Sequence, residues 1–121
     1  MSSSPTEYLR HMLAEAEYVV EHSTTLDQSA FLVDETLKRA FVRSIEIIGE
    51  AAKKVPEDFR QQHAAIEWRA MAGMRDRLIH GYFGVDYELV WDVVINKVPQ
   101  LRQQLHELLT EPSSETKRPS N

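Results

Sequence analysis

The stretch DETLKRAFVRSIEIIGEAAKKV, residues 34–55, carries the helical pattern from which the fold class follows. Its apolar residues recur at steps of three and four, which places them on one stripe of an α-helix. They are Leu37, Phe41, Ile45, Ile48, Ala52 and Val55, widened by Ala40, Ile47 and Ala51. We therefore predict a mostly buried helix from Asp34. An interior glycine costs about 1 kcal/mol relative to alanine, so we expect another helix to pack closely against Gly49.

The segment on the N-terminal side predicts a second long helix. Ser4-Pro5-Thr6-Glu7 is typical of a capping box with proline in the first turn. Apolar residues at helical spacing follow, and the pattern runs to about Glu21. Residues 26–33 predict a short helical turn before the helix that begins at Asp34.

The segments on the C-terminal side complete the bundle. After a connection with one helical turn beginning at Pro56, residues 66–79 are apolar almost all round and predict one buried helix. Residues 86–109 alternate steps of four and three, the pattern of an antiparallel bundle, with Asp86 as N-cap and a kink expected at Pro99. We therefore predict an all-α fold, an up-and-down bundle of four to five helices.

The 121 residues fit one domain, which we place at residues 1–109. Residues 110–121 are polar and contain two prolines, and we expect them to form a disordered tail. Cysteine is absent, no charged and apolar leader opens the chain, and no apolar run approaches the ~20 residues that cross a bilayer. These features favour a soluble cytoplasmic protein.

The charge distribution restricts how the chain could bind nucleic acid. The formal net charge is -5, which argues against phosphate binding over the whole surface. Only the middle segment, residues 38–77, is basic, with nine Lys and Arg against six acids. Any contact with RNA is therefore expected to be local.

Three consecutive charges, Arg75, Asp76 and Arg77, lie in the last turns of the predicted apolar helix, just before His80. Buried charges are costly unless they are paired or used, so this conflict indicates a site at the end of the bundle. RNA can be cut without a metal when one group moves protons and a cation stabilises the phosphorane. Histidine and arginine suit these roles, because histidine exchanges protons near neutrality and arginine holds two phosphate oxygens.

The spacing of these residues leaves alternatives open. Asp76 lies four residues before His80, on the same face if the helix persists, and could orient the imidazole. Arg75 is five residues away, about 140° around a helix, so a symmetric dimer would bring the two groups together more readily than one chain. A structural interpretation also fits, because arginine favours a helix C-terminus and histidine before Gly81 is common in caps.

Other polar residues have simpler interpretations. Arg77 could contact RNA or pair with Asp76 or Asp86, and we favour the pairing. Glu46 and Glu50 are spaced to hold a metal, but Arg43 and Lys54 lie at helical distance from them and favour ion pairs instead, so we predict no metal site. The remaining histidines show no ligand spacing; they are His11, His22, His63 and His106.

The sequence RDRLIHGY, residues 75–82, resembles the R-x4-H-x-Y signature of HepT toxins in the HEPN superfamily. Residues 43–54 resemble the second-helix block of that group and residues 66–74 its lead into the signature, so the similarity covers about residues 6–109. It implies a homodimer whose two signatures face each other across a cleft. It also implies a metal-independent ribonuclease with Arg75 and His80 as catalytic residues and no cofactor.

The resemblance further implies a partner. In this group a minimal, MntA-like nucleotidyltransferase antitoxin uses ATP and Mg²⁺ to attach AMP to the signature tyrosine, here Tyr82. From the residues alone, Tyr82 is more simply a core aromatic beside Phe83. Two rival hypotheses therefore remain, a non-catalytic helical module that binds a nucleotidyltransferase and a signature that only packs a dimer interface.

Overall fold

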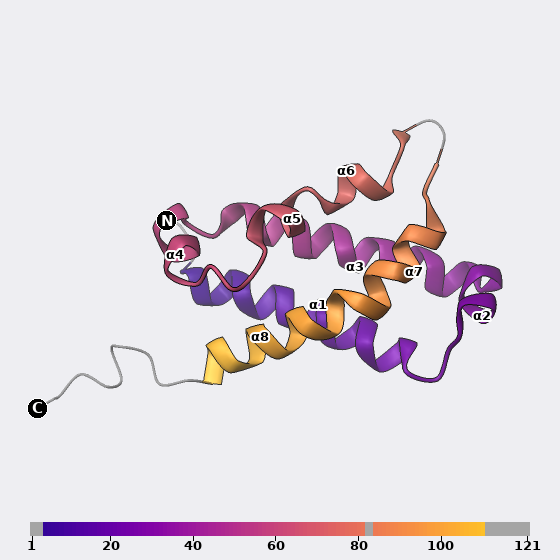
Figure 1. The fold of residues 1–121 in the computed structure, drawn as a ribbon, viewed down its shortest axis with the longest axis horizontal. Coiled ribbons are helices and arrows are strands. Elements are labelled where there is room, and N and C mark those ends of the chain that lie inside the picture. The colour runs from indigo at the N-terminus through magenta and orange to yellow at the C-terminus, as the bar shows by residue number, and fades with distance from the viewer. Residues whose placement is uncertain (1–3, 82–83, 111–121) are drawn as a thin grey trace, which may run out of the picture.

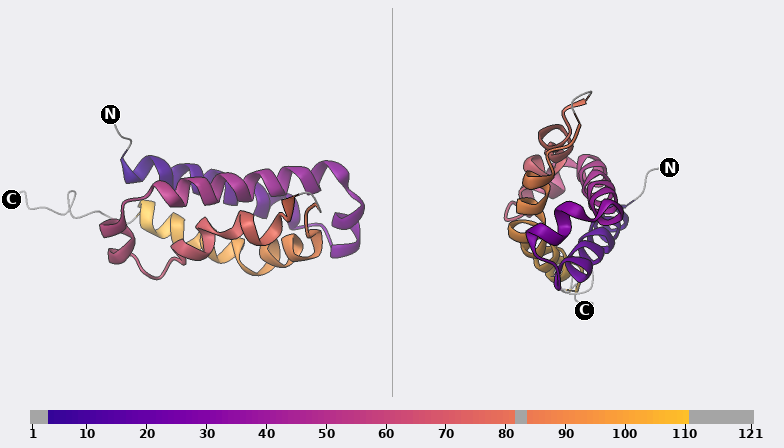
Figure 2. Two further views of the ribbon diagram at one scale, coloured as in Figure 1. Left: turned by 90° about the horizontal axis from the view of Figure 1, so that it is seen from above. Right: turned by 90° about the vertical axis from the view of Figure 1, so that its right-hand side faces the viewer.

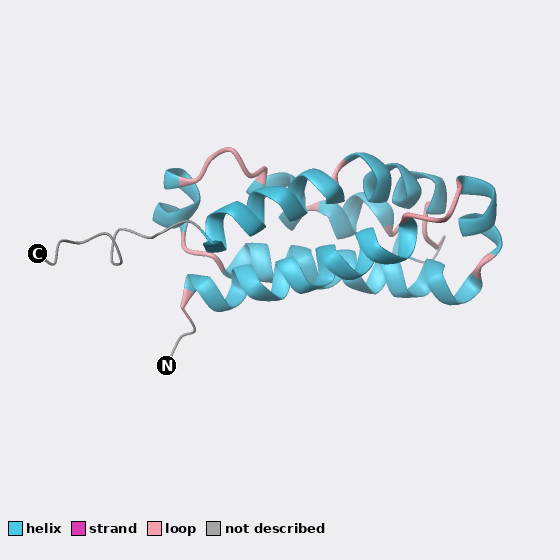
Figure 3. Ribbon diagram, turned by 90° about the horizontal axis from the view of Figure 1, so that it is seen from below, coloured by secondary structure: helices cyan, strands magenta, loops and turns pink. Residues whose placement is uncertain are grey.

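The structure is a computed structural model that describes residues 4–81 and 84–110 (Figure 1). Eight helices occur in this part of the chain: α1 (Pro5–Ser23), α2 (Gln28–Val33), α3 (Glu35–Lys54), α4 (Glu57–Gln62), α5 (Trp68–Ala72), α6 (Met74–Leu78), α7 (Tyr87–Asn96) and α8 (Val98–Thr110). The described residues contain helices and loops and no strand (Figure 3). The prediction of an all-α fold is confirmed.

The helices form an elongated bundle. The two long helices α1 and α3 lie side by side and run in opposite directions, while α5–α6 and α7–α8 cover them from the other side (Figure 2). Helix α1 packs against α3 and α8, and α3 also packs against α5. The predicted up-and-down arrangement is therefore confirmed, with the shorter helices added at the ends and along one side.

The apolar stripe of α3 forms the centre of the core. Phe41, Ile45, Ile48 and Ala52 are each 3% exposed or less, and burying such side chains supplies most of the stability of a bundle. Gly49 lies on the same helix, and a Cβ there would be 3.0 Å from the backbone oxygen of Met71. The close packing predicted at Gly49 is confirmed.

Aspartate caps fix where two of the longer helices begin. The Asp34 carboxylate accepts a hydrogen bond from the Leu37 amide at α3, and the Asp86 carboxylate accepts one from Leu89 at α7, as predicted for Asp86. At α1, Ser4 occupies the N-cap position before proline, but its side chain makes no capping hydrogen bond. The predicted capping box is wrong in that respect.

Two predicted helices are interrupted. The single helix expected over residues 66–79 is wrong, because Gly73 (φ −92°, ψ 2°) separates α5 from α6 and glycine is a poor helix former. The C-terminal helix is interrupted at Lys97, two residues before Pro99, which has no N–H for the preceding turn; the predicted kink is confirmed.

The short connecting helices and the end of the last helix lie close to where the sequence predicts them. The short turns expected over residues 26–33 and after Pro56 are α2 and α4. Helix α8 includes Thr110, the first residue of the predicted tail, and the rest of that tail lies outside the described residues. Among the described helices, none is both long and apolar enough to span a bilayer.

Candidate active site

The signature residues lie where α6 ends and the chain turns back toward α7. Ile79 pairs with Val85 in an antiparallel bridge, and the Asp86 amide donates to the Leu78 oxygen at 2.9 Å. The His80 amide donates to the Gly84 oxygen at 2.7 Å. These bonds make a narrow hairpin base that projects beyond the helices (Figures 1 and 2). These backbone bonds, together with the packing of Ile79 and Val85 against the core, therefore position the segment.

Glycines allow this reversal. Gly81 and Gly84 have φ values of 54° and 97°, a backbone region that other residues rarely adopt. Gly81 belongs to the hairpin and does not cap a helix, because α6 has already ended at Leu78. Tyr82, the predicted modification site, and Phe83 lie outside the described residues.

Arg75 lies on α6 with its side chain 52% exposed. The helix buries Met74 and Leu78, four residues apart on one face, so the charges between them face solvent. Arg75 Nε donates to Glu46 Oε2 of α3 at 3.2 Å, and Arg75 Nη1 lies 3.7 Å from Asp76 Oδ1. The expectation that these charges are buried is therefore wrong; they form a solvent-facing group supported by α3.

His80 is exposed and lies outside the helix. The same-face argument for Asp76 required the helix to persist to residue 80, and this condition is not met. Asp76 is 86% exposed and lies beside Arg75 instead. The geometry thus gives Asp76 a contact with the arginine and none, among the described residues, with the histidine.

Arg77 is also exposed at this end of α6. Within the two described ranges, no ion pair joins it to Asp76 or Asp86, so the favoured structural pairing is wrong. Its guanidinium is a second exposed cation of α6, two residues and therefore about 200° around the helix from Arg75. Arginine in such a position can bind phosphate oxygens.

Glu46 is the site residue that sequence reasoning missed. It was interpreted as a partner of Arg43, and that pair exists at 3.7 Å, but its other oxygen binds Arg75. The contact joins residues 29 positions apart, so helical spacing could not reveal it. Glu50 pairs with Lys53 at 3.6 Å, not with Lys54. Both glutamates therefore bind basic side chains.

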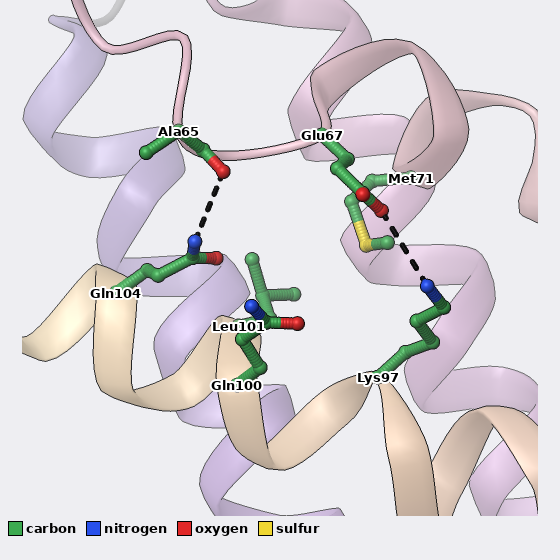
Figure 4. A pocket seen from close by; sticks show the side chains of 7 residues that line it. All are labelled: Ala65, Glu67, Met71, Lys97, Gln100, Leu101 and Gln104. Atoms are coloured by element: carbon green, nitrogen blue, oxygen red, sulfur yellow. Dashed lines mark hydrogen bonds and ion pairs between the residues drawn. The ribbon is translucent and has the colours of Figure 1, made fainter.

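The two hollows described next lie away from Arg75 and His80. Figure 4 shows a cavity of about 20 Å³ where Gln104 Nε2 donates to the Ala65 oxygen at 2.9 Å and Lys97 Nζ lies 3.8 Å from Glu67 Oε1. A larger hollow of about 270 Å³ lies near α4 and is lined by Gln62, His63, Ala64, Ala65, Ile66, Gln104, Glu107 and Leu108. Neither includes Arg75 or His80.

A single chain provides only two exposed groups for catalysis. It presents a guanidinium anchored from behind and an imidazole on a projecting hairpin, both open to solvent. Enzyme sites are usually concave and exclude water. In the single chain both groups lie on open surface.

A family profile and several similar proteins agree with the family resemblance found in the sequence. The sequence profile described as "Ribonuclease HepT-like" matches residues 12–108. A "Putative RNase" of Caldanaerobacter subterraneus subsp. tengcongensis is 45% identical over 106 residues, covering 88% of this chain and 95% of that protein.

A "Probable ribonuclease HepT" of Thermococcus cleftensis is 40% identical over 108 residues, covering 89% of this chain and 98% of that protein. A "Putative RNase" of Methanocaldococcus jannaschii is 39% identical over 102 residues, covering 84% of each. No solved structure matches the chain. Profile and relatives agree over nearly the whole helical bundle, and the chain belongs to the ribonuclease HepT-like family of the HEPN superfamily.

Proposed function

We propose that this chain is a metal-independent endoribonuclease that acts as a homodimer, and that Arg75 and His80 are its catalytic residues. The observation that carries the proposal is the exposure of both side chains at one end of the bundle, inside the segment matched by the family. A structural role would leave these residues packed or capped. An exposed guanidinium and imidazole are instead placed to meet a phosphodiester.

The reaction needs one proton to move and one anion to be stabilised. The imidazole of His80 takes the proton of the ribose 2′-hydroxyl, whose oxygen attacks phosphorus and forms a new P–O bond. The P–O5′ bond breaks, and the imidazolium returns the proton to the leaving oxygen. The products are a 2′,3′-cyclic phosphate and a 5′-hydroxyl. The guanidinium of Arg75 stabilises the negative charge on the phosphorane oxygens.

A dimer completes the site. In one chain the two groups are solvent-exposed, and neither of the two hollows described above includes them. A two-fold axis at this end would lay one hairpin against the α6 face of the other subunit, and each guanidinium would meet the partner subunit's His80. The closed cleft would exclude water and hold the RNA locally, which fits a chain whose overall charge is -5.

The chain would act as the toxin of a toxin–antitoxin pair. Its neutralising partner would be a nucleotidyltransferase that transfers AMP from ATP to the Tyr82 hydroxyl with release of pyrophosphate. Tyr82 is two residues from His80 in the sequence. An adenylate there would place bulk and negative charge where the RNA phosphate binds, and would therefore block cleavage.

The test is a cleavage assay on end-labelled RNA in EDTA. His80→Ala and Arg75→Ala should each lower the rate by on the order of 10²-fold or more, because proton transfer and charge stabilisation are each of that size. His63→Ala is the matched control, since that imidazole packs at a tilt against Phe59 near α4, with 4.4 Å between the ring centroids. Folded His80 and Arg75 variants that cleave as fast as the parent would refute the assignment.

A second function has an observation in its favour. The acidic net charge suits a module that binds a nucleotidyltransferase without cutting RNA. Intact-mass measurement after incubation with the partner and ATP separates the two cases when it is combined with the cleavage assay. AMP addition that vanishes in Tyr82→Phe, together with no cleavage by the unmodified parent, would favour this alternative.

A further inference from the structure

Glu46 makes the contact that most directly controls the candidate catalytic arginine. Its Oε2 accepts a hydrogen bond from Arg75 Nε at 3.2 Å, while its Oε1 lies 3.7 Å from Arg43 Nη1. The Glu46 side chain is only 24% exposed, less than half the exposure of Arg75. A carboxylate held between two guanidinium groups and largely covered by protein has little freedom to turn away.

The bundle fixes the position of this carboxylate. Glu46 follows the core residue Ile45, which is 3% exposed. One turn later, Gly49 lets α3 approach the Met71 backbone of α5. This contact sets the distance between α3 and the α5–α6 segment, and hence the distance from Glu46 to Arg75. The support for the arginine therefore comes from a helix that packs closely into the core.

The hydrogen bond also selects which part of the guanidinium remains available. Nε is occupied by Glu46, so the Nη groups are left for a ligand on the solvent side. Asp76 lies near one of them at 3.7 Å but is 86% exposed, and so holds it weakly. Paired N–H groups of this kind match two oxygens of a phosphate.

We propose that Glu46 is a positioning residue, which binds Arg75 through Nε and so presents the Nη donors to the scissile phosphate. This inference rests on the proposed function, because it gives Arg75 a phosphate to bind. It predicts that Glu46 contributes to the chemical step and little to stability. It also predicts that Arg75 is ordered before RNA arrives.

The experiment compares Glu46→Ala and Glu46→Gln with Glu50→Ala, the matched control one turn along α3. Glu50 also pairs with a basic residue, Lys53 at 3.6 Å, but is 61% exposed and does not contact Arg75. Steady-state cleavage of labelled RNA gives kcat and KM separately, and thermal unfolding checks the fold. NMR of the arginine Nε–H groups reports the hydrogen bond and does not depend on RNA cleavage.

Glu46→Ala should lower kcat by roughly tenfold or more with KM and the melting temperature nearly unchanged, because a misplaced catalytic group loses rate steeply. Glu46→Gln should retain part of the rate, since its amide oxygen can still accept from Nε. The Arg75 Nε–H signal should shift and exchange faster with water in Glu46→Ala. Glu50→Ala should match the parent in every measurement.

The outcomes separate this inference from the function beneath it. If the parent cleaves RNA, Arg75→Ala does not, and Glu46→Ala cleaves at the parental rate, the positioning role is refuted while the proposed function stands. A faster Glu46→Gln variant would also refute it, because the carboxylate would then compete with phosphate. If the parent and Arg75→Ala are equally inactive while the Nε–H signal still depends on Glu46, the proposed function fails and the contact is only structural.

Discussion

The two ends of the bundle differ in how they treat polar side chains. At the α4 end, His63 packs against Phe59, its carbonyl accepts from the Trp68 indole, and hollows lie beside it. At the hairpin end, His80 and Arg75 are exposed, and neither hollow described above includes them. The end that looks most like a pocket thus holds its histidine in packing contacts. The open end presents the groups suited to chemistry.

Under the proposed dimer, concavity within one chain is a poor guide to the position of the site. A hollow formed by one chain can arise where short helices join imperfectly, as it does around residues 62–66. A site shared by two chains is only half-built in one chain and appears as an exposed surface. For this protein, the exposed arginine with a rigid partner behind it is the more informative signal.

The largest expected effect is a difference in RNA cleavage between two arginine variants, one in each region. Arg75→Lys should lower RNA cleavage by on the order of 10²-fold, because lysine lacks the planar fork that binds Glu46 and phosphate together. Arg60→Lys changes an arginine that pairs with Glu57 at 2.9 Å near α4, and cleavage should be unchanged. Equal loss in the two variants would show that general electrostatics, not a site at the hairpin end, drives cleavage.

The next effect concerns the packing that supports the hairpin end. Gly49→Ala should lower the free energy of unfolding by about 1 kcal/mol net. Its Cβ would meet the Met71 backbone oxygen at 3.0 Å, which costs about 1–3 kcal/mol, while the helix propensity of alanine returns about 1 kcal/mol. Gly73→Ala is the control, because its Cβ would meet backbone at 3.5 Å, an ordinary contact. Urea unfolding followed by circular dichroism measures both, and a Gly49→Ala variant as stable as the parent would contradict the close approach.

A smaller effect is expected from the cap at the hairpin base. Asp86→Ala removes the acceptor for the Leu89 amide and should cost about 1 kcal/mol. The loss should appear locally, as faster amide exchange at Asp86 and Leu89. Asp27→Ala removes the equivalent cap of α2, whose side chain accepts from Ala30, and should leave exchange at the hairpin unchanged. Uniform exchange changes in both variants would argue against local control.

The smallest effect tests the second cation. Arg77→Ala should weaken RNA binding a few-fold and lower the salt dependence by about one phosphate contact. Lys53→Ala, a lysine paired with Glu50 away from the hairpin, should change neither. Filter binding at several salt concentrations measures both, and a steeper loss for Lys53 would move the RNA path to the exposed face of α3.

The fold was largely predictable from the sequence, and the site only partly. Periodicity identified the long helices and the need for Gly49, because both follow from spacing along one element. It failed at Gly73, where α5 and α6 separate although their apolar residues continue in phase. Backbone breaks of this kind depend on tertiary packing.

The candidate site residues also divide into those that the sequence identified and those that it missed. Arg75 and His80 could be named as candidates from their spacing, and their catalytic role stays a prediction. Glu46 was not recognisable as a partner of Arg75, since the contact crosses between helices. Asp76 was given a role that depended on a helix persisting past Leu78, and hairpin bonds ended that helix instead.

The most direct test of the central claim is complementation between two inactive variants. Arg75→Ala and His80→Ala would be co-expressed with different tags, and mixed dimers purified through both tags. Each mixed dimer should hold one complete site, with the arginine of one subunit facing the partner subunit's His80, and should cleave RNA at about half the parental rate. Mixed dimers as inactive as each variant alone would contradict a site shared between two chains.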